Sequence, residues 1–173
     1  MVEPPSYLGV AIGDWVAALK SSDSLERRLA AHALAEIGPA AREAVPALTE
    51  ALRDPESFVR VWAAAALARV QRENPNAIPA LVAGTHDGIS FVRSLAAWHL
   101  GRLDPTYPGI KSVVPELREL LNDNDPSVRA EALVALENLA GKGAPPAELK
   151  SLACGFRRSR SGIPIGSRPP IPI

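Results

Sequence analysis

The sequence predicts an all-α protein built as an α-solenoid, in which similar helix pairs stack side by side. The first reason is that four arginines stand in one local frame, each followed seven residues later by leucine and ten residues later by an aliphatic residue. They are Arg27, Arg60, Arg93 and Arg129, at separations of 33, 33 and 36 residues. The second reason is composition, because 47% of residues are hydrophobic but only 5% are aromatic, which favours closely packed helices. Recurrence at this period indicates a repeat array.

The first predicted element is a partial leading repeat that begins at residue 12. The segment IGDWVAALK places Ile12, Trp15 and Leu19 at helical spacing on one face. It resembles the second helix of the units that follow, without a first helix before it. Because the recurrence is already present at residue 12, a piece of a longer protein is an alternative to a complete chain.

Each recurring arginine lies in a predicted helix, the arginine helix of its unit. Apolar residues at −1, +3, +7 and +10 from the arginine fall within an arc of about 80° at roughly 100° per residue. In the second unit these residues are Val59, Ala63, Leu67 and Val70. Alanine occupies +3 in all four units, which allows a neighbouring helix to approach closely.

A second helix, the proline helix, follows in each of the three full repeats. It begins near Pro46, Pro79 or Pro115, and apolar residues recur at −1, +2 and +6 from the proline. Proline is tolerated in a first helical turn because its missing N–H would have no partner inside the helix. The 36-residue separation is explained by a three-residue insertion in the loop 104–111.

The incomplete last repeat has an arginine helix at about residues 127–140, and residues 146–154 are a candidate for a short final helix. We therefore expect a repeat domain over residues 1–155. Residues 156–173 contain four arginines, four prolines and no acid, so we expect a disordered tail. The tail carries a charge of +4 and the body a charge of −4. A weakly acidic body argues against nucleic-acid binding, which needs a basic stripe.

Other features limit the function classes further. The single cysteine, Cys154, excludes an intramolecular disulfide. The N-terminal residues do not resemble a signal peptide, and no apolar run approaches the roughly 18 residues of a membrane span. We expect a cytoplasmic protein that does not act at a membrane. His32, His86 and His99 lie in different units and are expected to share no face, so no metal or other cofactor is predicted.

These motifs resemble the HEAT-like repeats, in particular the short bacterial type found in phycobilisome lyases. The resemblance covers residues 12–152 and rests on the run D-P-x-x-x-V-R-x-x-A-x-x-x-L at 54–67, the V-P-x-L start of the proline helix, and an aspartate six residues before the arginine. It implies a right-handed α-solenoid of HEAT-like helix pairs. Ankyrin and tetratricopeptide repeats fit less well, because their signature residues are absent.

The resemblance also implies a ladder of aspartate and arginine side chains between adjacent repeats. The residues that match it are Asp54, Arg60, Asp87, Arg93, Asp123 and Arg129. A guanidinium can meet carboxylates on two sides, so each arginine is expected to join its neighbours. The first unit departs, because Ser21 stands six residues before Arg27.

Two surfaces are candidates for binding a partner. By the resemblance, the exposed side of the proline helices lines the concave face, where Glu50, Arg53, Glu116 and Glu119 lie. On the opposite, outer face, Trp98 stands nearly opposite the apolar stripe of its helix, with Arg102 beside it. A tryptophan at such a position can anchor a partner. Trp62 is expected instead to pack between repeats.

No catalytic constellation is found in the sequence, so the leading interpretation is a non-enzymatic scaffold that binds another protein or peptide. The runner-up, from the resemblance alone, is a subunit of a bilin lyase or isomerase. A HEAT-like DNA glycosylase is a third reading, and the acidic side of the proline helices speaks against it. The oligomeric state stays open.

Overall fold

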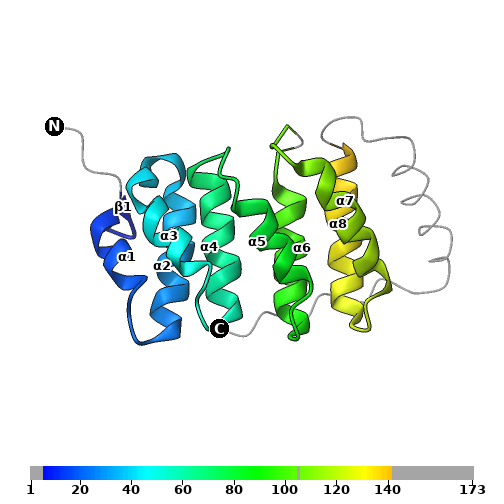
Figure 1. The fold of residues 1–173 in the computed structure, drawn as a ribbon, viewed down its shortest axis with the longest axis horizontal. Helices are drawn as coiled ribbons and strands as arrows, with labels where there is room; N and C mark the ends of the chain where they lie inside the picture. The colour runs from blue at the N-terminus through cyan, green and yellow to red at the C-terminus, as the bar shows by residue number, and fades with distance from the viewer. Residues whose placement is uncertain (1–5, 105, 142–173) are drawn as a thin grey trace.

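The computed structural model describes residues 6–104 and 106–141, and these residues form the all-α solenoid that the sequence predicts (Figure 1). The α-helices are α1 (Ile12–Ala18), α2 (Ser24–Ile37), α3 (Val45–Ala51), α4 (Ser57–Val70), α5 (Ala77–Thr85), α6 (Ser90–Arg102), α7 (Val113–Glu119) and α8 (Pro126–Gly141). Short 3-10 helices adjoin them at η1 (Gly38–Ala44), η2 (Ile110–Ser112) and η3 (Leu120–Asn122). Within this part of the chain no helix has the length and apolar character that a bilayer crossing requires.

The arginine helices α2, α4, α6 and α8 form one layer, and α1 with the proline helices α3, α5 and α7 forms the other. The predicted apolar stripe faces the interior: Val59, Ala63, Leu67 and Val70 of α4 are all at most 2% exposed. The alternation of the two helix types along the chain therefore produces a continuous two-layer core, in which each unit covers its neighbour.

The proline helices follow the same logic on the other side of the core. Leu48 of α3, Leu81 of α5 and Leu117 of α7 are fully buried. They occupy the +2 position from their prolines, as the spacing predicts. Pro46 lies in the first turn of α3, where no intrahelical hydrogen bond is lost.

Packing between neighbouring repeats is uneven along the solenoid. A Cβ atom added to Gly101 of α6 would lie 2.4 Å from the Cα of Ala135 in α8, so these two helices approach closely. In contrast, α4 packs less extensively on α6 than on α2. The backbones of α4 and α6 therefore lie farther apart, and the rings of Trp62 and His99 meet between them.

The N-terminal end contains a feature that the sequence analysis did not predict. Strands β1 (Ser6–Tyr7) and β2 (Val10–Ala11) form a short antiparallel hairpin before α1. Its turn uses positive φ angles at Leu8 and Gly9, as a two-residue hairpin turn requires. The candidate helix at 146–154 and the tail at 156–173 lie outside the described residues.

Candidate functional site

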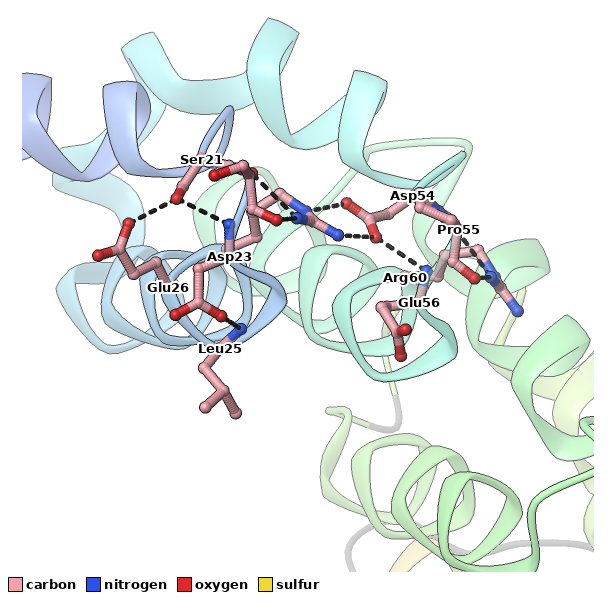
Figure 2. Close-up of polar contacts among 10 residues, drawn as sticks. Ser21, Asp23, Leu25, Glu26, Asp54, Pro55, Glu56 and Arg60 are labelled. Atoms are coloured by element: carbon pink, nitrogen blue, oxygen red, sulfur yellow. Dashed lines mark hydrogen bonds and ion pairs between the residues drawn. The ribbon is translucent and has the colours of Figure 1, made fainter.

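The recurring arginines hold their own loops by hydrogen bonds to backbone carbonyl groups. Arg60 Nη1 donates to the carbonyl oxygens of Asp54 at 2.8 Å and Pro55 at 2.9 Å (Figure 2). Arg27, Arg93 and Arg129 repeat this pattern with the residues six and five positions before them. The loop that leads into each arginine helix is thereby fixed by the helix itself.

The rest of the guanidinium reaches an aspartate of the following repeat. Arg27 donates to Asp54 through Nε at 2.6 Å and Nη2 at 2.9 Å. Arg93 makes the same two-bond contact with Asp123 at 2.7 and 2.8 Å. The two-carboxylate fork that we expected is therefore replaced by carbonyl groups on one side and one carboxylate on the other.

The second rung is weaker than its neighbours. Arg60 reaches Asp87 through a single Nη2 contact at 3.3 Å and donates a second bond to Ser57 Oγ at 2.8 Å. The side chain of Arg60 is 37% exposed, whereas that of Arg27 is 11% exposed. The hydroxyl of Ser57 also hydrogen-bonds the Asp87 carboxyl, so Ser57 bridges Arg60 and Asp87.

The departure at Ser21 does not remove the first rung. The residue six positions before each arginine accepts a hydrogen bond from that arginine through its backbone carbonyl. Any residue type can supply this group, and Ser21 O accepts from Arg27 Nη1 at 2.9 Å. The missing carboxylate would have served a preceding arginine. The expectation that the first unit is exceptional is therefore wrong for Arg27.

The rungs change the acidity of the aspartates. Hydrogen bonding to Arg93 lowers the pKa of the Asp123 carboxyl below its usual value. Burial alone would raise the pKa of Asp54, but the bonds from Arg27 and from the Glu56 N–H outweigh it and lower that pKa. These carboxylates are satisfied within the fold and are not free to bind a ligand.

The concave face brings few of its candidate residues together. Glu50 and Arg53 belong to α3 and its C-terminal end, while Glu116 and Glu119 belong to α7, and α5 lies between them. Glu50 lies 3.9 Å from Lys20, and Glu116 lies 3.1 Å from His86 Nε2. Two of the candidate carboxylates on this face therefore already contact side chains of neighbouring repeats.

The outer face carries a continuous run of apolar and aromatic side chains, which we call the outer strip. Its members are Leu25, Leu29, Phe58, Trp62, Phe91, Leu95 and Trp98. Phe91 is 66% exposed, Leu25 59% and Leu29 48%. The strip crosses α2, α4 and α6, so it draws on three successive repeats.

Two shallow hollows follow the strip. One, of about 650 Å³, is lined by Leu25, Arg28, Leu29, His32, Phe58, Trp62, Phe91 and Leu95. The Arg28 guanidinium lies 5.7 Å from the centroid of the Phe58 ring. The other, of about 450 Å³, is lined by Trp62, Phe91, Ser94, Leu95, Trp98 and Glu131. Glu131 is the acid that borders the second hollow, and burial raises the pKa of its carboxyl.

An aromatic stack underlies the strip and joins the repeats. Trp62 sits between His32 and His99, with edge-to-face contacts whose ring centroids are 4.7 and 4.8 Å apart. The expected packing of Trp62 between repeats is confirmed, whereas the expectation that His32 and His99 share no face is wrong. His99 also contacts Trp98 at 4.8 Å. Among the described residues no cluster of three or more His, Cys, Asp or Glu could hold a metal ion.

Sequence reasoning named Trp98 and Arg102, which lie together with the Arg102 guanidinium 4.5 Å from the Trp98 ring centroid. It assigned Trp62 to packing between repeats and did not recognise the strip as one continuous surface. The signal was present, because positions −2 and +2 from the arginine are apolar in the first three units. They are Leu25 and Leu29, Phe58 and Trp62, and Phe91 and Leu95; the last unit has Ser127 and Glu131 instead. These positions form a second stripe on the arginine helices.

The comparisons with known proteins agree with this architecture. The sequence matches the family described as HEAT repeats over residues 12–101 and 90–158. No curated protein matches the sequence.

Solved structures show the same fold. A chain in the complex of CpcE and CpcF of phycocyanin lyase from Nostoc sp. PCC7120 is 23% identical, with a TM-score of 0.62 and coverage of 90% of this chain and 91% of that one. One engineered protein is 28% identical, with a TM-score of 0.55 and coverage of 83% and 67%. A second engineered protein is 26% identical, with a TM-score of 0.54 and coverage of 83% and 68%.

Proposed function

The chain belongs to the HEAT repeat family, and we propose that it is a non-enzymatic scaffold whose outer strip binds an apolar segment of a partner protein. The observation that carries the proposal is the strip itself. Phe91, Leu25, Leu29 and Trp98 remain exposed on consecutive repeats, although the core beneath them is complete. Contiguous exposed apolar surface of this kind marks interaction sites, and aromatic side chains dominate binding hot spots.

The strip also indicates the chemistry of its partner. Packed helices lie about 8–10 Å apart, so a strip across three helices is roughly 20 Å long. The two hollows each offer room for a bulky side chain, and Glu131 stands beside the second hollow without an ion-pair partner among the described residues. We infer a segment that presents two large apolar side chains and one cationic side chain, which pairs with Glu131.

The concave face is the weaker candidate for this role. Its predicted residues, Glu50, Arg53, Glu116 and Glu119, are charged, and two of them already contact basic side chains of neighbouring repeats. Exposed ion pairs of this kind contribute little binding energy. Substitutions on this face therefore serve as the control for substitutions on the outer strip.

Affinity capture with three versions of the chain tests the proposal. The first is unchanged, the second carries Leu25→Ser and Phe91→Ser on the outer strip, and the third carries Glu50→Ala and Glu119→Ala on the concave face. All four altered side chains are exposed, so the variants keep their cores. A protein captured by the unchanged chain is then purified and titrated by calorimetry.

We expect the strip variant to bind the purified partner at least tenfold more weakly, because hot-spot truncations typically cost 2 kcal/mol or more. The concave-face variant should bind as the unchanged chain does. Loss of binding only in the concave-face variant would place the interface on the other side and overturn the proposal. A chain that instead pairs with itself would show a strip-dependent dimer by light scattering, and this too would refute a foreign partner.

A second candidate is a subunit of a bilin lyase or isomerase. What favours it is the likeness to the phycocyanin lyase structure over nearly the whole of both chains. At 23% identity that likeness supports the fold rather than the chemistry. Coexpression with a bilin and a phycobiliprotein decides, because chromophore attachment or removal that depends on this chain would favour the lyase over the scaffold.

A further inference from the structure

A small pocket lies between α4, α5 and α6, beside the outer strip. Its volume is about 150 Å³. Its lining residues are Ala65, Arg69, Leu81, Trp98, His99, Arg102 and Leu103. At roughly 30 Å³ for each water molecule in the liquid, this volume equals about five waters. The pocket therefore has room for a small organic molecule of a few non-hydrogen atoms.

Two arginines, Arg69 and Arg102, line the pocket, and no aspartate or glutamate does. Arg102 lies over the ring of Trp98, which holds its planar group in place by a cation–π contact. Within the described part of the chain, Arg102 has no hydrogen bond or ion pair. Arg69 donates from Nη1 to Glu36 at 2.6 Å, so the other donors of its guanidinium remain available. The site therefore has two positive side chains and one neighbouring carboxylate, that of Glu36.

His99 forms part of the pocket wall and is only 8% exposed. Its Nε2 atom is buried and has no hydrogen-bond partner among the described residues. Burial, and then the charges of Arg102, Arg69 and His32, lower the pKa of the His99 ring to about 3. The His99 ring is therefore a neutral part of the pocket wall and adds no charge to that of the two arginines.

We propose that this pocket binds a carboxylate attached to a short apolar group. Arg102 and Arg69 bind the carboxylate, whose two oxygens match the planar donor pair of a guanidinium. Trp98, Leu81 and Leu103 contact the apolar part. His99 contributes its neutral ring to the wall, and a bound anion offsets the charge of the two arginines beside it.

The pocket extends the proposed function, because Trp98 borders both the pocket and the outer strip. Such a carboxylate has two sources: a free short-chain acid, or the C-terminal carboxylate of a peptide that ends beside the strip. The chemistry is the same in both cases. A small acid needs no partner protein, so its binding can be measured even if the proposed partner does not exist.

The test is an NMR titration of the full chain with propionate, following the indole N–H of Trp98 and the ring nitrogens of His99. Propionamide has nearly the same shape without the charge and serves as the matched control ligand. The tripeptide Ala-Ala-Val, with a free and with an amidated C-terminus, separates the two sources. Arg69→Gln and Arg102→Gln remove the anion-binding groups, and Arg53→Gln removes an exposed arginine of the concave face as the control variant.

We expect saturable shifts of both side chains with propionate and none with propionamide. Arg69→Gln and Arg102→Gln should each weaken binding at least tenfold, and Arg53→Gln should leave it unchanged. Free-acid peptide that binds tenfold more tightly than propionate identifies a peptide terminus as the source, and equal affinity identifies the small acid.

Equal shifts with propionamide, or no saturable shift in the unchanged chain, would overturn the proposal without requiring any variant to fold. Inorganic phosphate that binds tenfold more tightly than propionate, through the same arginines, would overturn the carboxylate assignment. Leu25→Ser and Phe91→Ser should not affect propionate binding. The proposal about the pocket and the proposal about the outer strip are therefore tested independently.

Discussion

Arg93 donates two hydrogen bonds to the carboxylate of Asp123, from Nε at 2.7 Å and from Nη2 at 2.8 Å, across 30 residues of sequence. The side chains are 18% and 9% exposed, so the pair is largely shielded from water and salt. Arg93 also holds the carbonyl oxygens of its own loop. One guanidinium therefore fixes both the entry to α6 and the position of the following repeat.

Asp123→Asn should lower the free energy of unfolding by about 1–3 kcal/mol, because it replaces two charge-assisted hydrogen bonds of a shielded pair by weaker ones. Urea unfolding followed by circular dichroism measures the change. Glu50→Ala breaks an ion pair whose side chains are 70% and 73% exposed and should cost less than about 0.5 kcal/mol. Equal costs for the two variants would contradict an internal role for the rung.

The same rung predicts a loss of stability in acid. Hydrogen bonding to Arg93 lowers the pKa of Asp123 in the folded chain below its unfolded value of 3.8. The unfolded chain then binds the proton more tightly, so the stabilisation is complete above that pH and is lost as the pH falls through the folded pKa. Unfolding measured between pH 6 and pH 2 should show a smaller fall for Asp123→Asn. An unchanged acid profile in that variant would contradict the shift.

The imidazole ring of His99 should stay neutral between pH 8 and pH 5. Burial and the nearby arginines lower its pKa to about 3, so its NMR ring shifts should not move between pH 8 and pH 5. The unfolded chain takes up this proton near pH 6.5 and the folded chain does not, so the free energy of unfolding should fall as the pH drops from 6.5 toward 3. A ring that titrates near pH 6.5 in the folded chain would show that it is not buried as described.

Gly101→Ala should destabilise the chain by about 1–3 kcal/mol, the usual cost of overpacking. The added Cβ would lie 2.4 Å from the Cα of Ala135, which is backbone and cannot turn aside. Alanine is otherwise the better helix former by up to about 1 kcal/mol. Gly13→Ala in α1 supplies the control, since its Cβ meets nothing within 4 Å. Thermal unfolding should show a lower midpoint for the first variant only.

Most of the fold could be predicted from the sequence, because each repeat restates the same local pattern. The stripe of Val59, Ala63, Leu67 and Val70 is buried as its spacing implies. The hairpin at Ser6–Ala11 could not be predicted in this way, since it occurs once and its strands are only two residues long.

The site was harder to predict because it depends on how repeats are placed relative to one another. Trp62 brings His32 and His99 onto one face, although they occupy different positions in their own helices. The pocket beside Trp98 is lined by residues of α4, α5 and α6, so its existence depends on how three helices are placed, which no local pattern encodes. Phe91 and Leu25 were visible as a recurring −2 position, but a helix wheel of one unit does not show that they line up across three units.

The central claim is that the partner lies on the outer strip, and site-specific photo-crosslinking tests it most directly. A photoreactive amino acid replaces Phe91 on the strip in one version of the chain and Glu50 on the concave face in another; both side chains are exposed. Irradiation in the presence of the purified partner should give a covalent adduct from position 91 and none from position 50. An adduct from position 50 alone would contradict the account.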